Sequence, residues 1–162
     1  MFTPSSPPVA RSASSIASHY EDVVAVRMLG LAPKEVWSRR RAHIVAFERM
    51  LVDEGMTLVK VFLNVSKDEQ RERLQTRVDD PEKRWKFRHD DLKVRERFDE
   101  YLDAYDEVIA ETSTHHAPWY VVPADRNWVK AAAVATLLVE ALERIDPKLP
   151  DSEPGIEGLR VE

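Results

Sequence analysis

The chain has 162 residues, a formal net charge of -5, no cysteines and only four glycines. This length fits one domain, and the lack of cysteine excludes disulfides, thiolate metal ligands and cysteine nucleophiles while agreeing with a reducing cytoplasm. The negative charge argues against a general attraction to nucleic acid, and no apolar run is long enough to span a membrane, so we expect a cytoplasmic protein that binds neither.

Both ends of the chain have compositions that are typical of disorder. Residues 1–16 are rich in serine, proline and alanine, and they lack the basic start and apolar stretch of a secretory signal. Residues 147–162 are rich in proline and acidic residues. We therefore predict disordered segments at 1–16 and 147–162 around one domain, residues 17–146.

The first half of this domain alternates apolar runs with a helical pattern. Residues 23–28, VVAVRM, predict a short buried strand. Pro33 begins a helix that reaches Glu54, since apolar residues recur at three- and four-residue spacing until Gly55 ends it. Residues 57–65, TLVKVFLNV, give the strongest strand pattern, which suits a parallel strand that is covered on both faces.

The next helix begins with a capping box. Ser66 is the cap and Glu69 is the acidic residue three positions later, with acidic residues in the first turn as the helix dipole prefers. The sequence Asp79-Asp80-Pro81 ends this helix. A long amphipathic helix is expected over about residues 90–112, with an apolar stripe made of Phe98, Leu102, Tyr105 and Ile109.

The last two elements are a strand and a helix. Residues 119–122, WYVV, predict a third short strand that ends at Pro123. Asp125 is expected to cap a final helix that ends near Ile145. Of the four tryptophans we expect Trp85 to be exposed and the other three to lie in the core: Trp37, Trp119 and Trp128.

The predicted order of elements is β-α-β-α-α-β-α, which indicates an α/β fold with a parallel sheet. Three strands make a marginal sheet. We therefore expect the sheet to continue in a segment that this sequence does not encode.

The segment of residues 77–87, RVDDPEKRWKF, places four cations around a proline and ends in two aromatic residues. A mobile lid over a phosphate chain would use such side chains, because phosphoryl transfer mainly needs positive charge around the phosphate oxygens. The alternative is a helix connection whose cations pair with neighbouring carboxylates. The cations are Arg77, Lys83, Arg84 and Lys86, and the aromatic residues are Trp85 and Phe87.

A second candidate site is the segment of residues 18–22, SHYED. Glu21 or Asp22 could contact a magnesium ion or a ribose, and His19 could move a proton. The alternative is a solvated turn. The sequence contains no GxxxxGK[ST], GxGxxG or GxSxG motif, so it encodes no loop of backbone amides that would cradle a phosphate donor.

Six segments together resemble the polyphosphate kinase 2 family, P-loop-fold kinases that move phosphate between inorganic polyphosphate and nucleotides. They follow the family's order from Ser18 to Ile145. The SHYEDV form resembles the branch that phosphorylates both nucleoside mono- and diphosphates. The segments are SHYEDVVAVRM, LAPKEVWSRR, FERMLVDEG, VKVFLNVSKDEQRERLQTRVDDPEKRWKF, DEYLDAYDEVIAETST and APWYVVPADRNW.

The resemblance implies a P-loop-kinase-like parallel sheet with flanking helices and a helical lid over about residues 70–95. It implies a phosphate-binding role for four basic residues and a nucleotide-binding role for three polar ones. The former are Arg73, Arg77, Lys83 and Lys86, and the latter are Ser18, Glu21 and Asp22.

The sequence also departs from the family. The family's Walker A loop lies upstream of the matching segments, and Ile16 and Ala17 stand where the family has Asp or Asn followed by Arg. We therefore expect the C-terminal portion of a family member, truncated at the N-terminus. The resemblance implies Mg²⁺ as cofactor, with most of its ligands missing here, so we assign no metal ligand and no catalytic residue.

The function implied by the resemblance is phosphoryl transfer between inorganic polyphosphate and an adenine or guanine nucleoside mono- or diphosphate, with little activity for this chain alone. A complementing N-terminal fragment or a homo-oligomer are the expected protein partners. The alternative is a remnant that binds polyphosphate or nucleotide, or joins an oligomer, without catalysis. A partly folded remnant without function is the third interpretation.

Overall fold

The computed structural model describes residues 19–149, 152, 155–156, 158 and 160. The segment 1–16, which is predicted to be disordered, lies outside these residues, and so does part of the segment 147–162. No helix within the described ranges is long and apolar enough to cross a membrane.

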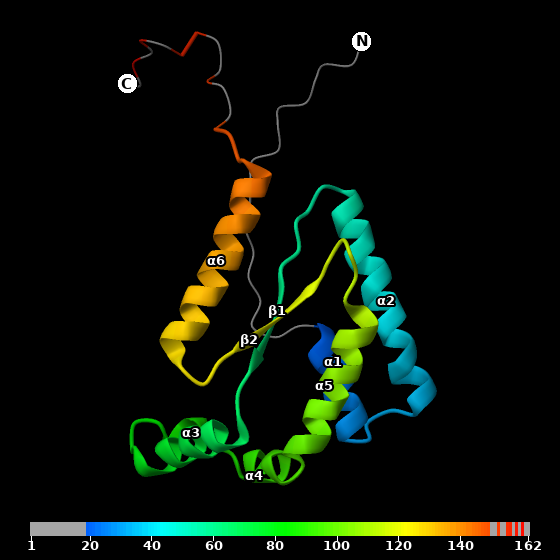
Figure 1. Ribbon diagram of the computed structural model, residues 1–162, viewed down its shortest axis with the longest axis vertical. Helices are drawn as coiled ribbons and strands as arrows, with labels where there is room; N and C mark the ends of the chain where they lie inside the picture. Colours follow the sequence, from blue (N-terminus) through cyan, green and yellow to red (C-terminus); the bar gives the residue numbers. More distant parts are fainter. Residues whose placement is uncertain (1–18, 150–151, 153–154, 157, 159, 161–162) are drawn as a thin grey trace.

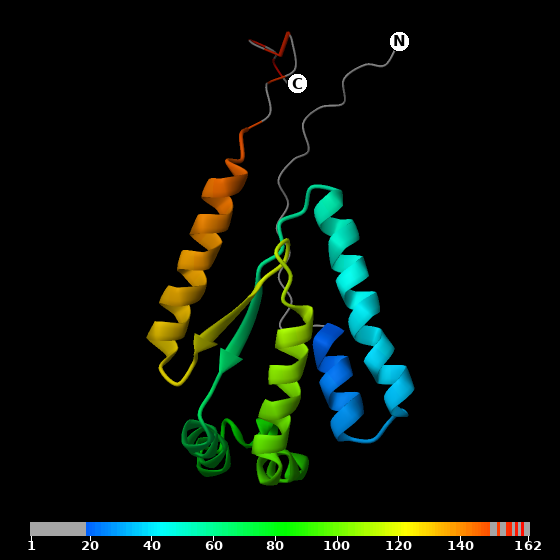
Figure 2. The same ribbon diagram turned by 45° about the vertical axis from the view of Figure 1, so that its right-hand side comes forward.

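Two parallel strands run through the middle of the structure and have helices on both sides (Figure 1). Helix α6 lies on one side of the strands, and α1, α2 and α5 lie on the other, as the turned view in Figure 2 also shows. Helices α3 and α4 lie beyond the end of β1. The elements are α1 (His19–Met28), α2 (Lys34–Asp53), β1 (Lys60–Asn64), α3 (Lys67–Asp79), the 3₁₀ turn η1 (Arg84–Lys86), α4 (His89–Glu96), α5 (Phe98–Thr112), β2 (Trp119–Pro123) and α6 (Asn127–Ile145).

The predicted strand over residues 23–28 is wrong, because these residues form the second half of α1. Tyr20, Val23, Val24 and Met28 are all buried, and their spacing places them on one face of a helix. This face packs against α2 and α5 and forms the main core. A short apolar run does not distinguish a buried strand from a buried helix face. The described part of the sheet consequently has two strands, not the three that were predicted.

Several predicted boundaries are confirmed. Helix α2 follows Pro33, and Gly55 after its end has a φ of 86°, a left-handed value that glycine adopts without strain. Ser66 caps α3 by accepting the backbone N–H of Glu69 at 3.2 Å, and α3 ends at Asp79.

The helix predicted over about residues 90–112 is interrupted, since α4 ends at Glu96 and α5 begins at Phe98. Arg97 between them has a non-helical backbone (φ -105°, ψ 24°). Its guanidinium donates to the carbonyl of Met28 at 2.7 Å and so connects this bend to the end of α1.

Two burial predictions are also wrong. The strand pattern of residues 57–65 yields the shorter strand β1, whose second half is exposed rather than covered on both faces, with Leu63 44% exposed. Trp128 is 69% exposed and therefore is not a core residue. Trp85 is exposed as predicted.

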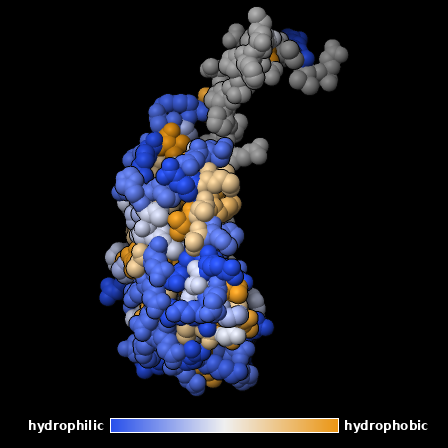
Figure 3. Space-filling view, turned by 90° about the vertical axis from the view of Figure 1, so that its right-hand side faces the viewer, coloured by the Kyte–Doolittle hydropathy of each residue, from blue (hydrophilic) through white to orange (hydrophobic). Residues whose placement is uncertain are grey.

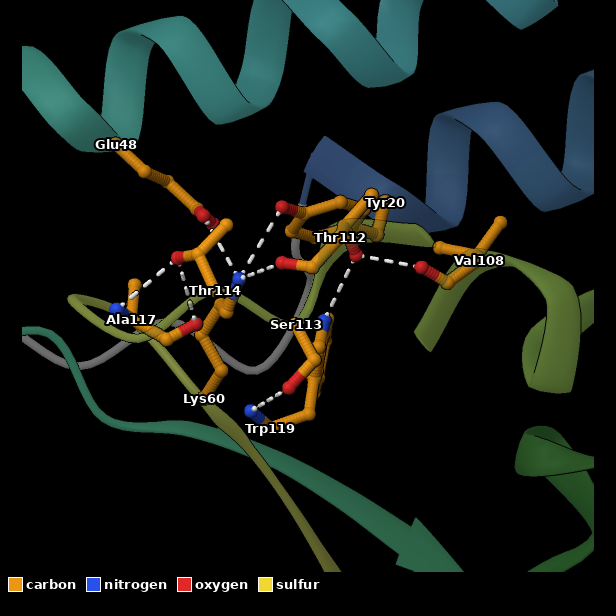
Figure 4. Close-up of polar contacts among 9 residues, drawn as sticks. All are labelled: Tyr20, Glu48, Lys60, Val108, Thr112, Ser113, Thr114, Ala117 and Trp119. Carbon is orange, nitrogen blue, oxygen red and sulfur yellow. Dashed lines mark hydrogen bonds and ion pairs between the residues drawn. The ribbon is translucent and has the colours of Figure 1, made fainter. Parts of the chain in front are cut away.

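The amino ends of both strands meet at a buried ion pair (Figure 4). The ammonium of Lys60 donates to Glu48 at 2.7 Å and to the carbonyl of Thr112 at 2.9 Å. It also lies 5.2 Å from the ring centroids of both Tyr20 and Trp119, within the range of cation–π attraction. These five residues come from α2, β1, α5, α1 and β2, so one cation connects five elements. Burial raises the pKa of the Tyr20 phenol far above its usual value.

The carboxyl ends of the strands are connected by a second set of polar contacts. The N–H of Ala124 donates to the carbonyl of Asn64 at 2.8 Å and extends the parallel ladder beyond β2. Asp125 was expected to cap α6, but its carboxylate instead accepts the N–H of Ser66 at 2.7 Å, and no side chain caps α6. This hydrogen bond holds the pKa of Asp125 below its usual value of 3.8.

Removing the buried ammonium should strongly destabilise the fold. Lys60→Met leaves the Glu48 carboxylate buried without its partner, which costs about 3–5 kcal/mol in free energy of unfolding, measured by urea titration. The matched control is Lys67→Met, because Lys67 and Asp99 are also 2.7 Å apart but exposed, and such pairs contribute about 1 kcal/mol or less. Equal losses in the two variants would show that burial of the Lys60 pair is not what matters.

The charge of Asp125 should stabilise the protein only above acidic pH. The pKa of Asp125 is lower in the folded protein than in the unfolded chain. The ionised carboxylate therefore stabilises the folded state at pH values above the unfolded pKa, and this contribution is lost as the pH falls through the folded pKa. We therefore expect wild type to exceed Asp125→Asn in thermal stability at neutral pH, and the difference to shrink below about pH 4. A difference that stays constant down to pH 2 would contradict this assignment.

Candidate functional site

A cleft of about 300 Å³ opens between α3 and α4, next to the residue that follows β1. In open α/β sheets, ligands bind outside the carboxyl ends of the strands, and this cleft lies at that end. Two predicted phosphate-binding residues line it. The lining residues are Val65, Gln70, Arg73, Leu74, Arg77, Asp91 and Val94.

Arg73 lines the cleft but its guanidinium is largely occupied. It donates to Glu69 at 2.7 Å and to the carbonyls of Ala124 at 2.7 Å and Asp125 at 3.1 Å. Glu69 lies four residues earlier on α3, whereas the two carbonyls follow β2. Arg73 therefore fixes α3 against the end of the second strand and so positions one wall of the cleft.

Arg77 lies one turn further along the same wall and is much less constrained. Its ion-pair partner among the described residues is Asp91, at 3.9 Å, which is too long for a hydrogen bond. The Asp91 carboxylate also accepts the N–H of Arg88 at 3.0 Å. Because the Arg77 side chain is 39% exposed, its donors remain accessible to an anion that enters the cleft.

The cations of the loop between α3 and α4 have local partners. Lys83 pairs with Asp80 at 2.7 Å, and this contact is the main cause of the lowered pKa of Asp80. Arg84 donates to the carbonyl of Val78 at 2.8 Å. Lys86 lies 5.2 Å from the ring centroid of Trp85, itself 78% exposed. Lys83 and Lys86 do not line the cleft. The pairing with a neighbouring carboxylate that the alternative interpretation predicts is present for Lys83, whereas Arg84 binds a carbonyl and Lys86 an aromatic ring.

The predicted nucleotide-binding residues lie away from the cleft. Ser18 is outside the described residues, and Glu21 and Asp22 are exposed in the first turn of α1. Tyr20 in the same turn contacts Lys60 and Trp119, which begin the two strands. This turn therefore lies near the amino ends of the strands, opposite the cleft, and a nucleotide role for these residues stays a prediction.

The described residues do not fit a magnesium site. Within the described ranges, no three His, Asp or Glu side chains are close enough together to hold a metal ion. The adjacent His115 and His116 line a separate cavity of about 180 Å³ beside α6, together with Glu140.

Sequence reasoning missed three features of the site. These are the position of Asp91 opposite Arg77, the contact between Ser66 and Asp125, and the structural role of Arg73. Only the role of Arg73 had a local signal in the sequence, namely its position four residues after Glu69 on a predicted helix, where an ion pair is expected.

The comparisons with known proteins agree on one family. The model of the family "Polyphosphate kinase 2 (PPK2)" matches residues 8–150. The chain is 53% identical over 145 residues to the AMP/ADP-polyphosphate phosphotransferase of Meiothermus ruber, covering 90% of this chain and 54% of that protein. It is 38% identical over 149 residues to the ADP-polyphosphate phosphotransferase of Rhodopseudomonas palustris, covering 85% and 52%.

A solved structure gives the same result. The crystal structure of polyphosphate kinase 2 from Arthrobacter aurescens matches with a TM-score of 0.78 and 46% identity, covering 83% of this chain and 47% of that one. This chain spans about half the length of these relatives. The sequence resemblance and the α/β fold class are both confirmed, and the chain belongs to the polyphosphate kinase 2 family.

Proposed function

We propose that this chain takes part in phosphoryl transfer between inorganic polyphosphate and nucleoside mono- or diphosphates, and that its cleft holds part of the phosphate chain. The observation that carries the proposal is the Arg77 guanidinium, which lines a cleft at the carboxyl end of β1 with its acidic partner at 3.9 Å. The names of the Meiothermus ruber and Rhodopseudomonas palustris proteins specify AMP and ADP, which supports adenine nucleotides before guanine nucleotides.

Arginine is suited to this role because its planar guanidinium can donate two parallel hydrogen bonds to a phosphate group. Asp91 would keep Arg77 oriented until an anion displaces the carboxylate. Arg73 would act mainly as a positioning residue, since its donors already bind Glu69 and two carbonyls.

Lys83 and Lys86 would join the site by movement of the loop that carries them. The Lys83–Asp80 pair is solvent-exposed, with side chains 49% and 34% accessible. Exposed ion pairs contribute only about 0–1 kcal/mol, so exchanging Asp80 for a phosphate oxygen costs little. The loop thus remains a candidate lid, although its cations pair locally in this structure.

We further propose that the reaction takes place in the cytoplasm and uses Mg²⁺, which would reduce the charge repulsion along the phosphate chain. The described residues do not form a site for this ion, so we assign no step to it.

A binding module without turnover is the second candidate function. It is favoured by the absence of a phosphate-cradling glycine loop from the sequence. In that case the cleft would bind polyphosphate, and catalysis would require groups from elsewhere.

Replacement of Arg77 should weaken polyphosphate binding. Arg77→Ala removes a charge-assisted hydrogen bond of about 1.5–3 kcal/mol, so we expect roughly a tenfold to hundredfold increase in Kd by isothermal titration calorimetry at low salt. Lys83→Ala should give a smaller loss, and binding should weaken as salt increases.

The matched control is Arg71→Ala. Arg71 lies on the same helix with an acidic partner at the same distance of 3.9 Å, but it does not line the cleft. An Arg71→Ala variant that binds as weakly as Arg77→Ala would show that general positive charge, and not the cleft, binds polyphosphate.

The 162-residue chain alone should show negligible turnover. Loss of a single preorganised electrostatic donor typically lowers a rate by about 10²–10³, and this sequence has no glycine loop to supply several such donors. The measurement is ATP formation from polyphosphate and ADP by the purified chain. A rate above that of an Arg77→Ala preparation purified in parallel would contradict the prediction.

A further inference from the structure

Helix α6 is apolar on more of its surface than its contacts in this structure explain. One side packs against β2, where Ala141 and Val122 are buried. A second side, which we call the apolar flank of α6, consists of exposed residues at alternating spacings of three and four. They are Trp128, Ala131, Ala135, Leu138, Leu142 and Ile145.

The exposure of this flank is large for apolar side chains. Trp128 is 69% exposed, and Leu138, Leu142 and Ile145 are 49%, 51% and 47% exposed. Val139, 52% exposed, lies at the margin between this flank and the remaining side of the helix, whose polar residues are Thr136, Glu140, Glu143 and Arg144. A solvated helix normally keeps one apolar stripe for the core, so an additional apolar flank indicates a missing contact.

The sheet beside α6 is also incompletely covered. Leu63 pairs in register with Val122 and therefore lies on the same face of the sheet. Val122 is 5% exposed beneath α6, whereas Leu63 is 44% exposed. Parallel strands are normally covered on both faces, and stable parallel sheets have more than two strands.

The face formed by α2 is mostly hydrophilic (Figure 3). It is not free of apolar side chains, because Phe47 and Met50 on α2 are 44% and 52% exposed. The apolar flank of α6 differs in its continuity, since its residues follow one side of the helix from Trp128 to Ile145.

The comparisons indicate what covers this surface. This chain matches 54% of the Meiothermus ruber protein and 47% of the Arthrobacter aurescens structure. The remaining part of those proteins has no counterpart among the matched residues. A second half that adds strands to the sheet and a helix beside α6 would cover Leu63 and the apolar flank together.

We propose that the apolar flank of α6, together with Leu63, is the docking surface for a second polypeptide, namely the half of a polyphosphate kinase 2 chain that this protein does not match. This half would extend the two-stranded sheet and bury the exposed residues of α6. The contact is apolar, so it requires neither polyphosphate nor nucleotide.

The experiment is co-expression of the tagged 162-residue chain with the segment of the Meiothermus ruber protein that lies outside the matched residues. Co-purification and the mass of the complex, measured by light scattering after gel filtration without phosphate ligands, give the result. We expect a one-to-one complex with wild type, and at least a tenfold lower yield of complex with Leu142→Glu.

The matched control is Thr136→Glu, which places the same new residue on the polar side of the same helix. This variant should form the complex as wild type does, and circular dichroism of each variant alone checks that the fold is retained.

The proposal is overturned by recovery of the wild-type chain without the segment, or by equal yields for the two variants. The proposal is also overturned if the wild-type chain self-associates and Leu142→Glu abolishes this self-association, because a second copy of the chain would then occupy the surface. Phosphate binding by the cleft is measured separately, so either proposal can fail without the other.

Discussion

The buried ammonium of Lys60 is the constraint on which the rest of the structure depends. The charged side chain of Lys60 is only 9% exposed, so its charge must be paired. The partners of Lys60 come from helices that are far apart in the sequence. Glu48 fixes α2, Tyr20 fixes α1, and Thr112 and Trp119 fix the turn from α5 into β2. The amino ends of both strands are therefore joined by one polar cluster, whereas the cleft that contains Arg77 lies at the opposite ends.

The carboxyl ends of the strands combine fixed and accessible polar groups, which is what an anion site requires. Arg73 donates hydrogen bonds to Glu69 and to the carbonyls of Ala124 and Asp125. The Asp125 carboxylate accepts the N–H of Ser66, so these contacts hold the walls of the cleft in place. Arg77 in the same cleft is held only by a loose contact with Asp91. Preorganised walls with one accessible cation bind a phosphate group at a lower ordering cost than a cluster of mobile lysines would.

The sequence predicted those elements whose signals are local. Pro33, Gly55 and the Ser66 cap mark helix ends correctly, because each acts through its own backbone. The error in α1 came from considering residues 23–28 without Tyr20, whose spacing to Val23 and Val24 reveals a helix face. The bend at Arg97 and the role of Asp125 depend on partners 69 and 59 residues away, which no local pattern encodes. The four predicted phosphate-binding residues separate in the structure. Arg73 and Arg77 on α3 line the cleft, whereas Lys83 and Lys86 contact Asp80 and Trp85 within their own loop.

The cleft and the apolar flank of α6 are connected through the two-stranded sheet. In the proposed function the cations of the cleft would neutralise a phosphate chain. Phosphoryl transfer also needs donors that hold the reacting phosphoryl group, and the glycine loop that supplies them in P-loop proteins is absent from this sequence. The sheet that positions the cleft is also the element with uncovered apolar residues, at Leu63 in β1. A second half that extended this sheet would place its strand ends at the same edge as Val65 and Asp125, because parallel strands share a carboxyl edge. Covering the apolar surface and completing the phosphate site would then be one structural event, since the same added strands would do both.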